Sequence, residues 1–459
     1  MKYVAFKDLK KKKVLSAETV LLFGFLLIIV VGSLLLFLPF SNTFHSLHPK
    51  YYFDCLFTAV SCVCVTGLST VTPAVDFTPF GQGVMLLLIQ VGGLGFMTIA
   101  VLLSRIIRRK ITPKEQLIAA QAYGLASNEN VRGLITRIVL RTLLIEGVGA
   151  LLLLLRMWVY AESFGKAIWM SVFHSVSAFC NAGFDLFSFE EGSLTGIYND
   201  YLILSVLMVL IVVGGIGFVI WDDLYDNLRK KRRKLSVYSR FILIATLVLI
   251  LFGTVLTLIF EWDNPLTLGK MNYFEKGFNA LFHSVSLRTA GFASFGNAAM
   301  RETTKLVSCI FMFIGGASGS TAGGVKVGTV GIILFSVFAS AVGKKTLVIG
   351  KRTINWQVVQ RATALFFVGL FIIFAFTGVI ALLENKDTVD LLYEVTSAFA
   401  TVGLSANLTA SLSIPTKLLI MVLMYFGRVG VLTITASLAG RTSGAENGIK
   451  YPDTNFYIG

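Results

Sequence analysis

Charged side chains are scarce in this chain. Only 14% of its 459 residues are Asp, Glu, Lys or Arg, whereas 55% are hydrophobic. Soluble globular domains carry about 25% charged residues, so this composition excludes a water-soluble protein with an ordinary surface. The sequence therefore predicts an integral membrane protein.

Histidine and cysteine are also scarce, with four and five residues in the chain. The cysteines have neither the spacing of a disulfide framework nor that of a zinc site. His174 and His283 each precede a serine, but the third group of a hydrolytic triad is not evident, so packing or polar anchoring is the better interpretation. A membrane enzyme would need several such side chains around one cavity. We therefore predict no enzymatic activity, no catalytic residue and no catalytic cofactor.

The basic residues form short clusters rather than one continuous surface. The net charge is +15, but Lys and Arg gather in the N-terminal tail, after Ser104, after Asn227 and from Lys344 to Arg352, next to apolar runs. Clusters of this kind mark the cytoplasmic side of a membrane protein. They predict a multi-pass protein of the cell membrane with a cytoplasmic N-terminus, and they disfavour binding of nucleic acid.

One short segment occurs in four versions. It reads Phe-His-Ser-Val-Ser-Leu-Arg-Thr-Ala-Gly-Phe at residues 282–292, and similar segments occupy residues 57–68, 173–184 and 393–404. Each is rich in Ser, Ala and Thr, ends in Gly followed by Leu or Phe, and is too short to cross a bilayer. The closing glycines are 116, 108 and 112 residues apart, which predicts four similar units: Gly67, Gly183, Gly291 and Gly403.

Each short segment lies between two long apolar runs. A unit therefore crosses the membrane, dips partway back and crosses again. This predicts an all-α polytopic membrane protein with eight spanning helices and four re-entrant pore segments around one pseudo-fourfold pore. The predicted spans are Val20 to Pro39, Gly81 to Ile107, Leu134 to Trp158, Tyr201 to Leu224, Phe241 to Phe260, Leu306 to about Val342 with an interruption, Ala362 to Leu383, and Leu418 to Leu438.

The predicted boundaries follow these units. They are a cytosolic basic tail at residues 1–17, repeat 1 at 18–110, a cytosolic connector at 111–132, repeat 2 at 133–234, repeat 3 at 235–352 with an intramembrane loop at 315–326, repeat 4 at 353–440, and a C-terminal tail at 441–459. The first apolar run is too long for the core of a signal peptide and lacks a cleavage site, so it is predicted to remain as a membrane helix.

The four short segments predict a cation filter. Non-helical backbone at membrane depth is tolerated only where it is buried in protein or lines a water-filled cavity. Carbonyl oxygens gathered around one axis can replace the hydration shell of an ion, and glycine permits a close approach of the backbone. One such sequence alone would be read as an ordinary loop, but four copies favour a filter. The predicted potassium-binding residues are Val65, Thr66, Gly67, Asn181, Ala182, Gly183, Thr289, Ala290, Gly291, Thr401, Val402 and Gly403.

A glycine cluster recurs in the second helix of each unit, as Val91-Gly-Gly-Leu-Gly-Phe96, Val213-Gly-Gly-Ile-Gly-Phe218, Ile314-Gly-Gly-Ala-Ser-Gly319 and Phe426-Gly-Arg-Val-Gly430. With the four filter motifs in register, the chain resembles the Trk/Ktr/HKT superfamily of potassium transporters. Their fold is four M1–P–M2 repeats in one chain. The likeness covers about Val20 to Leu438, and a glycine closing all four motifs implies potassium selectivity.

The third and fourth units depart from the common pattern. In the third, the cluster expands to a run whose glycine content excludes a stable helix interior, and the resemblance implies an intramembrane gating loop. In the fourth, Arg428 replaces the second glycine. An arginine inside a spanning helix must face a cavity or a partner. The resemblance implies that this arginine helps to control permeation. The predicted gate residues are Gly315, Gly316, Ala317, Ser318, Gly319, Ser320, Thr321, Ala322, Gly323, Gly324, Lys326 and Arg428.

The sequence leaves the roles of three charged residues open. Lys326 adds positive potential or anchors backbone, and both readings stand. Arg141 and Glu146 lie within a predicted spanning helix, where they pair with each other or snorkel, and no transport role is assigned to them.

Within the superfamily the chain is most similar to the Ktr membrane subunit, because the first repeat directly follows a short basic tail. The resemblance implies potassium uptake through a gated pore by a homodimer that binds a ring of cytosolic, nucleotide-binding regulatory subunits. Those subunits would be separate proteins, since no Rossmann glycine signature is present here. The alternative is an ion-coupled secondary transporter, such as a sodium/potassium symporter, whose repeats are often inverted; the repeats here share one orientation.

Overall fold

The computed structural model describes residues 17–44, 48–95, 98, 131–187, 193–229, 234–344, 346–350 and 352–430. These residues are mainly helical, with one antiparallel hairpin of strands β1 (Leu347–Ile349) and β2 (Arg352–Ile354). The predicted helical fold class is thereby confirmed. The N-terminal tail, most of the connector predicted at 111–132 and the C-terminal tail lie outside the described residues.

Four long helices begin the predicted units: α1 (Ala17–Phe37), α7 (Val131–Met157), α11 (Val237–Glu261) and α15 (Trp356–Leu383). Their outer faces carry exposed apolar side chains such as Leu151, Leu247 and Phe371, as expected for helices in contact with lipid. Within the described residues, α7, α11 and α15 are long and apolar enough to cross a membrane, and a fourth span results if the bent pair α9–α10 counts as one. Helix length alone therefore does not establish eight spans.

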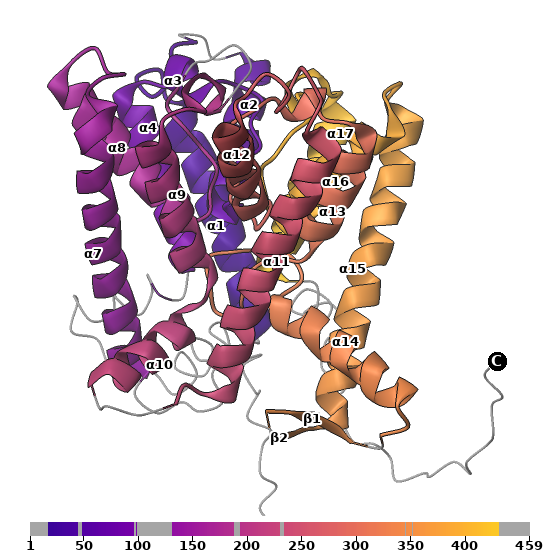
Figure 1. Cartoon of the computed structure of the whole chain (residues 1–459). Coiled ribbons are helices and arrows are strands. Elements are labelled where there is room, and N and C mark those ends of the chain that lie inside the picture. Colours follow the sequence, from indigo (N-terminus) through magenta and orange to yellow (C-terminus); the bar gives the residue numbers. More distant parts are fainter. Residues whose placement is uncertain are drawn as a thin grey trace, which may run out of the picture.

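Four short helices contain the beginnings of the repeated motifs: α2 (Pro49–Cys64), α8 (Phe164–Phe179), α12 (Tyr273–Ser286) and α16 (Thr388–Ala400). Each has 13 to 16 residues, or about 20–24 Å of helix, which is less than the roughly 30 Å of a bilayer core. All four lie in the upper half of the molecule in Figure 1. The chain leaves each helix just before the predicted filter residues.

The second helices of three units are shorter than predicted. Helices α4 (Pro79–Leu94), α9 (Tyr201–Gly215) and α17 (Ile414–Val429) all end inside the glycine cluster. The last glycine of each cluster has a positive φ, 82° at Gly95, 95° at Gly217 and 88° at Gly430, which a continuous α-helix does not allow. The uninterrupted spans predicted to Leu224 and Leu438 are therefore wrong at these glycines, and the end predicted at Ile107 lies outside the described residues.

Beyond the break in the second unit, the chain changes direction. Helix α10 (Phe218–Arg229) is bent by 96° from α9 and runs across the lower end of the molecule in Figure 1. The third unit has the interruption that the sequence predicts: α13 (Glu302–Phe313) and α14 (Val327–Ala341) are separated by an irregular loop. Helix α14 and the β1–β2 hairpin also lie at the lower end.

The units follow one another around a closed circuit. Each second helix contacts the short helix of the next unit, in the pairs α4–α8, α9–α12, α13–α16 and α17–α2. The circuit closes between the last and first units, where the hydroxyl of Tyr425 on α17 donates to the carbonyl of Leu22 on α1, 2.7 Å away. Short connecting elements at the upper end are α3 (Pro73–Asp76), η1 (Thr195–Ile197), η2 (Asn297–Ala299) and η3 (Thr409–Ser411).

Candidate functional site

The four predicted filter segments share one backbone conformation. Two residues before each glycine the chain takes a positive φ, with 56° at Val65, 59° at Asn181, 69° at Thr289 and 51° at Thr401. The glycines themselves have φ between 70° and 97°. Positive φ is costly for β-branched residues such as Val and Thr and persists only where the surroundings impose it. These turns are therefore held by specific contacts.

The contacts come from one serine in each short helix. In all four segments the amide of the residue before the glycine donates to the carbonyl of this serine, at 2.7–2.9 Å. Two of the serine hydroxyls accept from the glycine amide, and the other two donate to the carbonyl after the glycine. The four residues are Ser61, Ser177, Ser286 and Ser397. The sequence analysis missed this role, although a Ser five or six residues before the glycine is visible in every copy.

The structure brings the four segments together in a ring. A Cβ atom added to Gly67 would lie 2.5 Å from the carbonyl oxygen of Ala182, and one added to Gly183 would lie 2.7 Å from that of Ala290. Further around the ring, a Cβ atom added to Gly291 would lie 2.6 Å from the carbonyl oxygen of Val402. A Cβ atom added to Gly403 would lie 2.0 Å from that of Thr66. Each glycine is thus needed for the close approach of the next segment.

The carbonyl oxygens of this ring have no hydrogen-bond donor among the described residues. Within the part of the chain that the structure describes, none of the predicted filter residues accepts a hydrogen bond at its backbone oxygen. The hydroxyls of Thr66 and Thr401 are also buried without a partner among these residues. Buried backbone carbonyls are paired in the great majority of cases, so a group of unpaired ones is suited to a dehydrated cation.

The irregular loop of the third unit packs against two of the filter segments. The hydroxyl of Thr321 donates to the carbonyl of Phe179, 3.1 Å away, at the end of α8. A Cβ atom on Gly323 would lie 1.9 Å from Oγ1 of Thr401, so this glycine permits contact with the fourth segment. The loop therefore lies next to the filter, against residues at the start of its second and fourth segments.

Arg428 connects this loop to the first unit. Its guanidinium donates to the carbonyl of Thr321 in the loop and to that of Gly92 at the end of α4, with a further contact of 3.3 Å to the carbonyl of Gly93. The ammonium of Lys326 donates to the carbonyls of Ala322 and Gly323, at 2.6 and 3.2 Å. Both residues thus fix the backbone of the loop, which supports the anchoring reading of Lys326.

The other intramembrane charged residues do not pair with each other. Arg141 forms an ion pair with Asp222 of α10, whereas Glu146 is buried on α7 and accepts from the side chain of Gln90, 3.2 Å away. Of the two alternatives left open by the sequence, mutual pairing therefore does not occur, because the side chains reach different neighbouring helices.

The two histidines are buried inside the short helices. Nδ1 of His174 is 2.7 Å from the carbonyl of Met170, and Nε2 of His283 is 3.4 Å from the hydroxyl of Ser308. These contacts fit the polar anchoring predicted for them. Among the described residues, no group of three or more His, Cys, Asp and Glu side chains is arranged to hold a metal ion.

The family model of the TrkH cation transport proteins matches residues 24–443. The chain belongs to this family. TrkH-family membership identifies the chain as a cation transport protein of the membrane, a class of proteins that are transporters rather than enzymes. This agrees with the superfamily resemblance noted in the sequence.

Full-length relatives of this TrkH-family chain are known. It is 38% identical to the Ktr system potassium uptake protein B of Bacillus subtilis, over 98% of this chain and 100% of the relative. It is 39% identical to the potassium/sodium uptake protein NtpJ of Enterococcus hirae, over 98% of each chain. The crystal structure of the potassium transporter TrkH from Vibrio parahaemolyticus matches with a TM-score of 0.68 at 18% identity, covering 95% of this chain and 87% of that one, so the two share a fold.

Proposed function

We propose that this chain is the membrane subunit of a Ktr-type system and takes up potassium selectively across the cell membrane. The ion moves down its electrochemical gradient through a gated pore, without hydrolysis by this chain. The observation that carries the proposal is the ring of Gly67, Gly183, Gly291 and Gly403, whose neighbouring carbonyl oxygens have no donor in the described chain. The names of the relatives, which are uptake proteins for potassium or for potassium and sodium, support it.

The ring supplies oxygens in place of water. Amide groups of each filter segment donate backwards to the short helix, so the carbonyl groups are left to face an ion. A potassium ion that enters loses its hydration shell and gains these oxygens in exchange. Since the backbone is held by Ser61, Ser177, Ser286 and Ser397, the segments cannot readily close around a smaller ion. In this proposal, all of the predicted filter residues bind potassium.

We further propose that four M1–P–M2 repeats surround the pore, with the boundaries predicted from the sequence. The closed circuit of helix contacts supports this arrangement. The end that carries α10, α14 and the hairpin is cytoplasmic, because α10 ends at Arg229, where the basic run of the sequence begins, and strand β2 of the hairpin begins at Arg352. The N-terminus would then be cytoplasmic as well.

The loop from Gly315 to Lys326 is the proposed gate. It packs next to the filter, and Arg428 ties it to the end of α4. Release of these hydrogen bonds frees the loop to move away and open the path. A homodimer that binds a ring of cytosolic nucleotide-binding subunits is the proposed assembly, and such subunits would act on this loop from the cytoplasmic end.

A second candidate is sodium/potassium symport. The relative NtpJ is named as a potassium/sodium uptake protein, and it is as similar to this chain as the potassium uptake protein B. The two functions differ in whether sodium is required for potassium to move.

The test is potassium uptake in a bacterial strain that lacks its own potassium importers. Cells that express the full chain should grow at low external potassium and take up rubidium, and sodium should not be required. No growth and no uptake, with the protein present in the membrane, would contradict the proposal. Uptake that depends strictly on sodium would favour the symporter instead.

A further inference from the structure

Arg288 stands directly before the third filter segment, at a position where the other segments carry small uncharged residues. The corresponding residues, three before each glycine, are Cys64, Cys180 and Ala400. All four side chains are buried. The third segment is also one residue shorter than the others. One of four equivalent positions therefore holds a positive charge.

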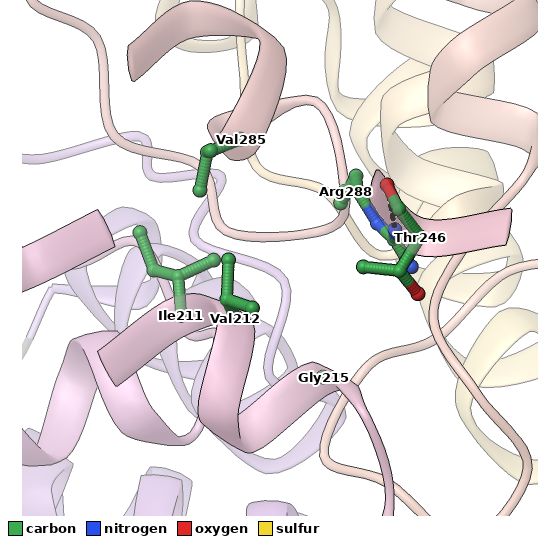
Figure 2. Close-up of a pocket in the computed structure, with 6 residues that line it drawn as sticks. All are labelled: Ile211, Val212, Gly215, Thr246, Val285 and Arg288. Carbon is green, nitrogen blue, oxygen red and sulfur yellow. Dashed lines mark hydrogen bonds between the residues drawn. The ribbon is translucent and has the colours of Figure 1, made fainter. Parts of the chain in front are cut away.

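The side chain of Arg288 extends away from the filter segment toward α11. Nη1 donates to the carbonyl of Thr246, 3.2 Å away, and only 7% of the residue is exposed. Figure 2 shows the guanidinium beside Thr246, at the edge of a small cavity. The cavity, of about 10 Å³, is otherwise lined by Ile211, Val212, Gly215 and Val285. It has room for one water molecule and offers no acidic side chain.

The charge of Arg288 is not neutralised nearby. Among the residues that the structure describes, no carboxylate forms an ion pair with Arg288, and the one hydrogen bond of its guanidinium is to a backbone carbonyl. A buried charge without a counter-ion is costly to keep, and its field is screened far less there than in water. A residue that serves only to fill space would not need this charge, since cysteine and alanine fill the equivalent positions.

Arg288 and the gate place three cationic side chains around the inner end of the filter. Lys326 and Arg428 also donate to backbone carbonyls, those of the loop and of α4. Arg288 therefore adds a third positive charge, behind the third segment, to the two charges at the loop. A pore conducts well only if an ion binds strongly enough to enter and weakly enough to leave.

We propose that Arg288 sets the affinity of the filter: its fixed positive charge lowers cation occupancy and so speeds the release of the ion toward the cytoplasm. The inference rests on the proposed potassium uptake. It assigns to Arg288 an electrostatic role distinct from selectivity, which depends on the carbonyl oxygens and the glycines. Loss of the charge should then tighten binding without changing which ion is chosen.

The test compares Arg288→Met, which keeps the length of the side chain without its charge, with Arg288→Lys, which keeps the charge. Initial rates of rubidium uptake are measured in the full-length protein over a range of external rubidium. Arg288→Met should lower KM about fivefold and lower the maximal rate, because release is slower. Arg288→Lys should stay close to the parent. The preference for potassium over sodium should be the same in all three.

Cys180→Ala, at the equivalent position of the second segment, is the matched control and should leave KM unchanged. An unchanged or higher KM in Arg288→Met would overturn the proposal, as would a loss of the preference for potassium, which would indicate a damaged filter. Arg288→Gln is the second neutral variant. If neither neutral variant reaches the membrane while Arg288→Lys does, the charge is needed for folding and the proposal fails. Absence of uptake by the parent would instead refute the proposed function.

Discussion

The glycines that close the filter segments are constrained in two ways. Their φ values are positive, and a side chain at any of them would meet the carbonyl of the next segment. The closest approach is at Gly403, where an added Cβ would lie 2.0 Å from the oxygen of Thr66. A substitution therefore both strains the backbone and displaces a carbonyl that we propose as a potassium ligand.

Replacement of Gly67 or Gly403 by serine should weaken the discrimination of potassium from sodium. The strain and the clash together should reduce the uptake ratio of the two ions by about tenfold or more. The measurement is the rate of potassium and of sodium uptake by each variant. Gly378→Ser, on α15, is the control, because no atom apart from those of its chain neighbours and its own helix backbone lies within 4 Å of the added Cβ there. Unchanged ratios in both filter variants would count against these residues as the filter.

Single residues show where sequence reasoning succeeded and where it stopped. The glycines were predictable because four copies of one motif ended in them. The ring formed by their neighbours is consistent with the predicted filter, whereas potassium binding itself stays a prediction. The anchoring serines were present in the same motif, but their role depends on a left-handed turn that the pattern of side chains does not predict. Arg288 was not singled out because the shorter third motif hides its equivalence to Cys64, Cys180 and Ala400.

At the scale of helices, the second helices α4, α9 and α17 share a cause for their breaks. Apolar residues continue past each glycine cluster, so hydropathy predicted longer spans. A single glycine inside a helix costs only about 1 kcal/mol relative to alanine, and hydropathy could not show which glycine would end the helix. The closer reason is packing: Gly92, Gly214 and Gly427 would each place a Cβ within 2.3 Å of a carbonyl at the end of a short helix. The glycine three residues further on, Gly95, Gly217 or Gly430, then takes a positive φ.

The loop between α13 and α14 should act as a barrier that Arg428 holds in place. Arg428→Ala removes charge-assisted hydrogen bonds from the loop, and deletion of residues 317–324 removes the loop itself. Each change should raise the maximal rate of rubidium uptake, by about tenfold for Arg428→Ala. Arg137→Ala, which loses only a half-exposed ion pair on α7, should leave uptake unchanged. Rates equal to the parent in both gate variants would remove the proposed gate.

The upper connection between α15 and α17 carries a pH-dependent contact. Glu384 accepts a hydrogen bond from the amide of Ser413, 2.8 Å away. Burial alone would raise the pKa of Glu384, but hydrogen bonds from Ser413 and Thr416 outweigh it and lower the pKa below its ordinary value. A carboxyl with a lowered pKa in the folded state stabilises the fold above its unfolded pKa, and this contribution is lost as the pH falls through the folded value.

Glu384→Gln tests this contact. In detergent, the unfolding temperature of the parent should exceed that of the variant at neutral pH, and the difference should shrink as the pH falls below about 4.5. A constant difference from neutral to acidic pH would show that the charge of Glu384 does not contribute. The effect should be small, because the side chain lies near the surface.

At the scale of the whole molecule, four similar units divide into two kinds. The first two units contain the plain glycine cluster, whereas the third contributes the loop and Arg288, and the fourth contributes Arg428. The circuit is closed by contacts between α17 and both α1 and α2, so residues far apart in the sequence meet under the filter. The repeat pattern predicted that the segments would converge. It could not predict how the asymmetric residues meet, because each occurs in only one unit.

Rubidium in crystals of the protein offers the most direct measurement of the central claim. Rubidium replaces potassium and scatters anomalously, so its position can be located without reference to the chain. The account predicts anomalous density on the axis enclosed by Gly67, Gly183, Gly291 and Gly403, between the carbonyl oxygens for which the described residues supply no donor. An ordered filter with no rubidium density on this axis, or rubidium bound only elsewhere in the molecule, would contradict it.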